Sequence, residues 1–136
     1  MKFPDWLQVY GNQGFRGACP KEEVEQITVF NWLRAEYPDT LGLIALHPRN
    51  EAQLRAGQHM AINRHKASGM TPGASDIIIP GAPSFVCELK RRDHTKSTWQ
   101  PGQKEYLLAA KQAGSFVCIA LGYEGAQEAI RAWLNQ

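Results

Sequence analysis

The stretch GASDIIIPGAPSFVCELK, residues 73–90, contains two short runs of strand-forming residues joined by a turn. The runs at 77–79 and 85–90 are mostly apolar, and the five residues between them, PGAPS, are typical of a hairpin loop. A loop centred on Ala82 pairs Ile79 with Phe85 and places Asp76 directly opposite Glu88. The sequence therefore predicts a hairpin that brings two carboxylates together.

Lys90 joins these carboxylates because side chains alternate along a strand. Glu88 and Lys90 project from one face of the second strand, and Cys87 and Leu89 project from the other. Two carboxylates that face each other repel unless a cation lies between them or one keeps its proton. We therefore expect Asp76 and Glu88 to bind a divalent metal ion.

Oxygen ligands favour a hard ion such as Mg²⁺ or Mn²⁺, which can hold a water beside a phosphate. The ammonium of Lys90 would position that water and offset the charge that builds on the phosphate. The alternative is that Asp76 only caps a strand while Glu88 and Lys90 form an exposed pair without chemistry.

The rest of the chain predicts a mixed α/β domain. An amphipathic helix is expected from Pro20 to Pro38, because apolar residues recur there at helical spacing. Its expected inner positions are Val24, Ile27, Phe30, Leu33 and Tyr37. We also expect a short strand at 41–46, a helix at 101–113 with Leu107 and Ala110 inward, a strand at 115–121, and a closing helix at 126–134 with Ala126, Ile130, Trp133 and Leu134 inward.

The chain is long enough for one core only, since it has 136 residues, of which 43% are hydrophobic. Residues 1–19 contain three glycines and little apolar periodicity, so we expect an N-terminal arm or irregular lead-in without chemistry. Residues 20–136 are expected to form the single domain. Residues 51–68 permit a helix, which Gly69 and Pro72 would end.

Basic residues are concentrated in the middle of the chain. Residues 49–104 hold nine Lys or Arg against four Asp or Glu, whereas the remainder holds six basic and nine acidic residues. Such a bias predicts a basic face if the fold gathers these groups. Arg91, Arg92 and Lys96 follow the second strand directly. Arg49, Arg64 and Lys66 are candidates for the opposite side of a groove in the protein that would bind the DNA backbone.

Composition excludes several other classes. The three cysteines are too few and too scattered for a disulfide framework, and no histidine has zinc-site spacing. The four histidines are therefore interpreted as polar surface or groove residues. No signal peptide and no apolar run of membrane-spanning length occurs, so we expect no membrane partner and an intracellular, cytoplasmic protein of a bacterium or a phage-infected host cell.

An ordered set of motifs resembles a known family. Asp76, the apolar strand, the turn and Glu88-Leu89-Lys90 resemble the PD-(D/E)XK nuclease signature and, more narrowly, the VRR-NUC family of virus-type replication and repair nucleases. Glu22 with Gln26 resembles the acid and glutamine of that family's first helix. The segment at 47–50 resembles the one that carries its asparagine, here Asn50, and Gln103 resembles the glutamine after the E-x-K strand.

The resemblance implies a restriction-endonuclease-like core, a mixed sheet flanked by helices. It also implies that Asp76, Glu88 and the main-chain carbonyl of Leu89 bind the metal, that Lys90 is catalytic, and that Glu22 and Gln103 line the same site. Glu23 and Glu25 compete with Glu22, because the sequence leaves the helix rotation open. Two departures are that Ser75 replaces the usual Pro before the catalytic Asp, and that the stretch 90–99 is longer and more basic.

The expected function is that of an Mg²⁺- or Mn²⁺-dependent DNA endonuclease. The resemblance favours branched DNA, such as four-way junctions or flaps, and paired cuts in a symmetric junction favour a homodimer. Two alternatives remain. One is a catalytically silent module that holds DNA through the basic segment, and the other is an α/β protein without a nucleic-acid role.

Overall fold

The computed structural model describes residues 1–48 and 59–136 of the chain. The four strands are β1 (Gln8–Tyr10), β2 (Ile77–Ile79), β3 (Phe85–Lys90) and β4 (Phe116–Leu121). The helices are α1 (Glu22–Glu36), α2 (Leu41–Ile44), α3 (His59–Ala67), the short 3-10 turn η2 (His94–Lys96), α4 (Gln103–Gln112) and α5 (Gly122–Leu134). The predicted α/β class is confirmed.

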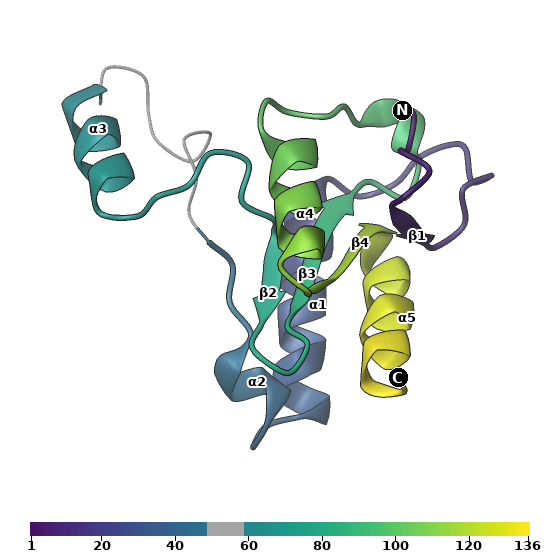
Figure 1. The fold of residues 1–136 in the computed structure, drawn as a ribbon. Coiled ribbons are helices and arrows are strands. Elements are labelled where there is room, and N and C mark those ends of the chain that lie inside the picture. Colours follow the sequence, from purple (N-terminus) through teal and green to yellow (C-terminus); the bar gives the residue numbers. More distant parts are fainter. Residues whose placement is uncertain (49–58) are drawn as a thin grey trace.

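The strands form one mixed sheet in the order β1-β4-β3-β2 (Figure 1). β2 and β3 pair antiparallel, whereas β4 pairs parallel with both β3 and β1. A parallel neighbour requires a crossover, and α4 supplies it between β3 and β4. Among the described residues, no helix is both long and apolar enough to cross a membrane.

The predicted hairpin register is confirmed. Ile77 pairs with Cys87 and Ile79 pairs with Phe85. Asp76 immediately precedes β2, so the same register continues to place it beside Glu88. The turn and the alternation of apolar side chains therefore specify this part of the fold locally.

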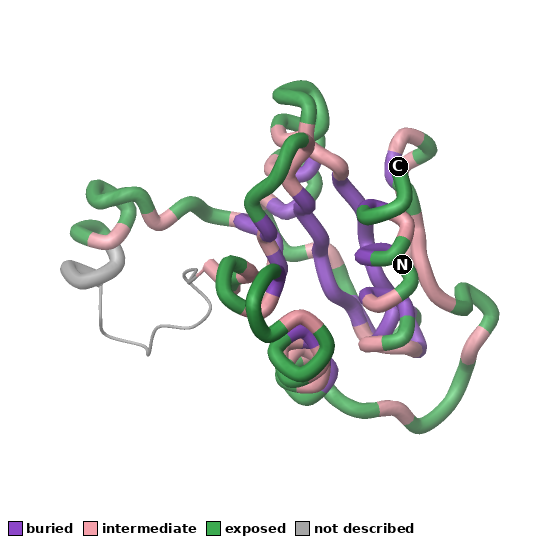
Figure 2. The backbone as a smooth tube through the Cα atoms, turned by 90° about the horizontal axis from the view of Figure 1, so that it is seen from below, coloured by how far each residue is buried: buried purple, intermediate pink, exposed green. Residues whose placement is uncertain are grey.

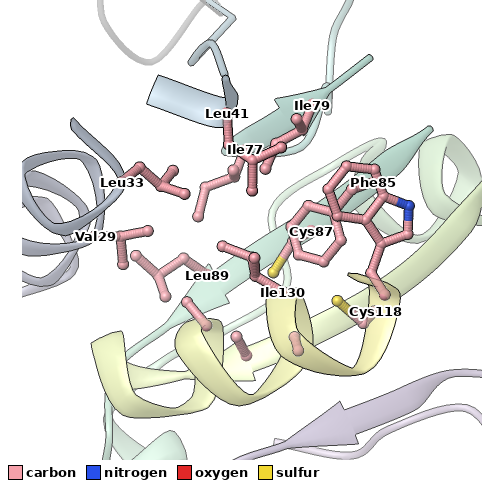
Figure 3. Packing of buried hydrophobic residues seen from close by; sticks show 14 residues of the cluster. Val29, Leu33, Leu41, Ile77, Ile79, Phe85, Cys87, Leu89, Cys118 and Ile130 are labelled. Atoms are coloured by element: carbon pink, nitrogen blue, oxygen red, sulfur yellow. The ribbon is translucent and has the colours of Figure 1, made fainter. Parts of the chain in front are cut away.

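The two faces of the sheet bury two separate apolar clusters. The first lies under α1 and α5, where Val29, Leu33 and Ile130 pack on Cys87 and Leu89 of β3 (Figure 3). The second lies under α4, whose Leu107 packs with the opposite face of the sheet; its buried members are Leu7, Val86, Leu107, Val117 and Ile119. Because β3 is central and covered on both sides, even its polar residues are buried.

The lead-in at 1–19, predicted to be irregular, contributes a strand to the sheet and a side chain to the core. Residues 8–10 form the edge strand β1, which pairs with β4 through Gln8–Cys118 and Tyr10–Ala120. Leu7 is buried in the cluster under α4. A strand of three residues is too short to show periodicity, so only its partner β4 reveals it.

The strand predicted at 41–46 was wrong for most of its length. Residues 41–44 form a single helical turn, α2, and only Leu46 makes a β-bridge, with Ile78 on the outer edge of β2. Gly42 permits this turn because a Cβ there would lie 2.7 Å from the Tyr37 carbonyl oxygen. Close packing of α2 on the end of α1 therefore replaces strand pairing.

The predicted inner faces of two helices also need correction. In α1 the buried residues are Glu25, Val29 and Leu33, whereas Val24 and Ile27 are more than half exposed, at 52% and 54%. The closing helix begins at Gly122, four residues earlier than expected, and its Leu134 is exposed. In contrast to these packed helices, α3 stands apart from the sheet in two perpendicular views (Figures 1 and 2).

Candidate active site

A pocket of about 730 Å³ lies beside the carboxyl end of β3. All five residues predicted to be catalytic line it: Asp76, Glu88, Lys90, Glu22 and Gln103. They come from the start of the hairpin, from β3, from the first turn of α1 and from the first turn of α4. Tertiary structure therefore brings together residues spread over 22–103.

Glu88 is the most deeply buried acid of the pocket, with 1% of its surface exposed. Its Oε1 accepts a hydrogen bond from Gln103 Nε2 at 2.8 Å, while Oε2 is buried without a hydrogen-bond partner among the described residues. Burial raises the pKa of Glu88 well above its usual value, and the charge of Asp76 raises it further, while Lys90 offsets part of the rise. The alternative of an exposed Glu88–Lys90 pair is therefore wrong.

Asp76 is held in place through both its side chain and its backbone. Its Oδ2 accepts a hydrogen bond from the Leu89 amide at 2.8 Å. Its main-chain carbonyl accepts one from His47 Nδ1, also at 2.8 Å. Because Leu89 lies between Glu88 and Lys90 in β3, the first of these bonds ties the Asp76 carboxylate to the strand that carries the other two charges.

The ammonium of Lys90 is buried, with 2% of the residue exposed, and well provided with acceptors. Nζ donates to the Thr98 carbonyl at 2.9 Å and to Gln103 Oε1 at 3.0 Å. Glu88 Oε1 lies 3.7 Å away, and the Trp99 ring centroid lies 5.8 Å away. A buried charge costs little when it is hydrogen-bonded and paired in this way.

Gln103 connects Glu88 and Lys90 through its side-chain amide. The nitrogen donates to Glu88, and the oxygen accepts from Lys90 and from the Gln100 amide. This pattern sets the orientation of the amide. Gly102, just before α4, has a φ of +88°, and a Cβ on the neighbouring Gly73 would lie 2.2 Å from the Gly102 carbonyl carbon, so two glycines let the pocket's two loops touch.

The three acids at the start of α1 have different surroundings. Glu22 lines the pocket and accepts a hydrogen bond from Ser97 Oγ at 2.9 Å. Glu23 is exposed to solvent. Glu25, only 2% exposed, instead accepts a short hydrogen bond from the Tyr123 amide at the start of α5 and lies 3.7 Å from Arg92. Of these three acids, Glu22 is therefore the one that the rotation of α1 directs to the pocket.

The donor set fits a hard divalent ion. Asp76 and Glu88 supply carboxylate oxygens, and the unpartnered Oε2 of Glu88 is a buried acceptor that lacks a donor among the described residues. No cluster of three or more His, Cys, Asp or Glu that could hold a metal occurs in the part of the chain that the structure describes. Any ion would therefore depend on two carboxylates completed by main-chain oxygen and water, as proposed for the Leu89 carbonyl.

The basic residues predicted to bind DNA have different positions. Arg91 donates to the carbonyls of Cys19 and Pro20, so its guanidinium holds the lead-in. Arg92 pairs with Glu25, stacks over Tyr123 and lines a separate pocket. Lys96 does line the candidate site, and its Nζ donates to the Gly17 carbonyl.

The remaining predicted DNA contacts lie on or near α3. Arg64 and Lys66 are exposed in this helix. Arg49 and Asn50 lie outside the described residues. Of the predicted DNA-binding residues that the structure describes, only Lys96 lines the pocket itself.

In the turn at 93–98, Ser97 and Thr98 line the pocket, and the sequence did not indicate either of them. Asp93 caps η2, and hydrogen bonds from the Thr95 hydroxyl and the Gly17 amide lower the pKa of Asp93 to about 2. His94 is buried, with its ring between the Met1 amino group and the Gln13 carbonyl, so its interpretation as a surface residue was wrong. These partners lie on the lead-in, far away in sequence.

Comparison with known proteins bears on the fold. No protein-family model matches the chain, and no curated protein matches it in sequence. Among solved structures, a chain described as "VRR_NUC domain protein" matches with a TM-score of 0.67 and 22% sequence identity, covering 87% of this chain and 91% of that chain. The likeness shows that the two proteins share a fold, and it confirms the predicted mixed sheet flanked by helices.

Proposed function

We propose that this chain is a metal-dependent nuclease that hydrolyses phosphodiester bonds of DNA. The observation that carries the proposal is the cluster of Asp76 with the buried Glu88, Lys90 and Gln103 at the end of β3. The fold of a protein described as a VRR_NUC domain protein supports it. Two carboxylates and a buried ammonium that line one open pocket are typical of a functional site.

Each side chain has a role that follows from its surroundings. Asp76 and Glu88, with the Leu89 carbonyl, would hold Mg²⁺ or Mn²⁺. The ion, when bound, supplies Lewis acidity and positive charge at the scissile phosphate. Lys90 contributes a fixed positive charge toward the phosphate oxygens and the attacking water, and Gln103 keeps Lys90 and Glu88 in register. Because these groups are already hydrogen-bonded, little reorganisation accompanies the reaction.

The surroundings of the pocket support a path for the DNA. A second pocket of about 350 Å³ adjoins the first across residues 71–74, since Thr71 and Ala74 line one and Pro72 and Gly73 line the other. It lies at the end of α3 that carries His65, near the exposed Arg64 and Lys66. A DNA backbone that leaves the site on this side would meet these cations.

We further propose that the substrate is branched DNA, such as a four-way junction or a flap, and that a homodimer makes paired cuts. A domain of this size offers little surface for reading bases, which favours recognition of DNA shape. The test is to incubate labelled duplex, flap, splayed and four-way substrates with the protein and Mn²⁺. Cutting that is confined to branched substrates supports the proposal, and equal cutting of all four contradicts the preference for branches.

Two variants test the site itself. Asp76→Asn and Glu88→Gln should abolish cutting while DNA binding remains. Glu124→Gln removes an exposed carboxylate on α5, away from the pocket, and should cut like the wild type. Full activity of either pocket variant would contradict the assignment. A wild-type protein that binds DNA but does not cut it would support the silent DNA-binding module.

A further inference from the structure

The position of the Glu22 side chain at the pocket depends on a hydrogen-bond partner. It is the first residue of α1, it is partly exposed, and the residue before it makes no side-chain cap. A glutamate in such a position samples several rotamers unless a partner holds it. The partner is Ser97, whose Oγ donates to Glu22 Oε1 at 2.9 Å.

The Ser97 hydroxyl has its own direction fixed. Ser97 is 6% exposed, and its Oγ accepts a hydrogen bond from the Arg91 amide at 3.1 Å. A hydroxyl has a single proton, so with the amide as donor to the oxygen, that proton is left for Glu22. The Ser97 amide also donates to the His94 carbonyl, which closes the turn.

The next residue, Thr98, contacts a second charged group of the pocket, the ammonium of Lys90. The Thr98 carbonyl accepts from Lys90 Nζ, so two consecutive residues hold side chains from two different elements, α1 and β3. The turn is itself braced by Asp93, which accepts from the Thr95 amide and from the Gly17 amide. One short segment therefore sets the relative position of Glu22 and Lys90.

We infer that Ser97 is a positioning residue of the site, which holds the Glu22 carboxylate toward the contents of the pocket. The inference rests on the proposed nuclease function. The hydrogen bond occupies Glu22 Oε1 and leaves Oε2 for water or substrate groups that enter. Ser97 acts only through Glu22 and does not itself take part in the reaction.

A double-mutant cycle tests this coupling. Ser97→Ala, Glu22→Ala and the double variant are compared with the wild type in single-turnover cutting with Mn²⁺. Ser97→Ala should slow cutting by roughly tenfold, the scale of removing one hydrogen bond to a charged group. In the Glu22→Ala background, which has no acceptor for the Ser97 hydroxyl, the same change should have little further effect. Equal reductions in both backgrounds, or no reduction in the wild type, would overturn the inference.

Two further variants guard against a merely structural effect. Ser97→Thr keeps the hydroxyl and should retain most of the rate. Ser84→Ala removes a partly buried hydroxyl, paired with Ser115 just before β3, and should cut like the wild type. Should Ser97→Ala unfold, Ser97→Cys keeps the volume with a weaker donor and replaces it in the cycle.

A second readout is independent of cutting. Scalar couplings of the Glu22 side chain, measured by NMR on the full chain without metal, should report one dominant rotamer in the wild type and averaging in Ser97→Ala. Unchanged couplings would overturn the inference. If the wild type cuts no DNA, the nuclease proposal fails, while these couplings still decide whether Ser97 holds Glu22.

Discussion

At the scale of single residues, the site consists of charges that the fold buries and then compensates. The Nζ of Lys90 is surrounded by a carbonyl, an amide and a carboxylate oxygen. Glu88 is compensated on one oxygen only, and its Oε2 is left without a donor among the described residues. This asymmetry separates the expected roles of the two residues, because a proton-bearing ammonium cannot ligate a cation and an open carboxylate oxygen can.

Lys90→Ala should lose turnover without losing metal, whereas Glu88→Ala should lose both. Removing the lysine deletes a charge aimed at the reacting phosphate, a loss on the order of 10²–10³ in rate, but leaves the oxygen ligands in place. Lys90→Arg should rescue poorly, since a planar guanidinium cannot occupy the same point. Calorimetric titration of Mn²⁺ beside single-turnover cutting separates the roles. A Lys90→Ala protein that binds no metal would show that the lysine is structural.

The buried Glu88 should also make the stability of the metal-free protein depend on pH. Its pKa in the folded state is raised above the usual value of 4.5, so the folded state binds the proton more tightly than the unfolded state. The resulting stabilisation is complete below pH 4.5 and is lost as the pH rises through the folded-state pKa. With chelator present, the Tm difference between Glu88→Gln and the wild type should therefore grow in favour of the variant as the pH rises. A difference that does not change with pH would contradict the raised pKa of the buried Glu88 carboxyl.

At the scale of elements, the sheet depends on a strand from the lead-in. β1 extends the sheet beyond β4, and Leu7 just before it packs with Val86 and Leu107 under α4. The same lead-in contacts the turn at 93–98 through Gly17 and Gln13. Residues that take no part in the chemistry therefore support the segment that positions Glu22 and Lys90.

Leu7→Ala should destabilise the protein by about 2–4 kcal/mol, the usual range for a leucine removed from a core. Val24→Ala is the matched control, because Val24 is an apolar residue at an exposed position of α1, and it should change the free energy of unfolding by less than about 0.5 kcal/mol. Urea denaturation of both variants checks the result. Equal effects would mean that the lead-in does not contribute to the core.

At the scale of the whole molecule, the candidate active-site pocket and the basic helix α3 are separate parts. The sheet with α1, α4 and α5 forms the body, and α3 stands apart from it (Figure 1). The segment 71–74 connects the two and contacts the start of α4 through Gly73 and Gly102. On the proposed function, the body performs the chemistry and α3 adds contacts with the DNA backbone.

Arg64→Ala combined with Lys66→Ala should weaken DNA binding across all sequences. The slope of log K against log salt should become flatter by about one unit for each phosphate group that the protein no longer neutralises. Arg92→Ala serves as a comparison, because Arg92 is paired with Glu25 away from the pocket, and it should leave the slope unchanged. Binding curves at several salt concentrations measure both. An unchanged slope in the α3 variant would place the DNA path elsewhere.

The sequence by itself determined the hairpin, its register and the shared face of Glu88 and Lys90, because turn chemistry and strand alternation act over a few residues. Only the tertiary structure decided what depends on distant partners. β1 exists because β4 offers an edge, and the rotation of α1 follows from burial of Val29 and Leu33. Ser97 reaches Glu22 across 75 positions of sequence. Such contacts form when separate elements pack, and no local pattern of side chains encodes them.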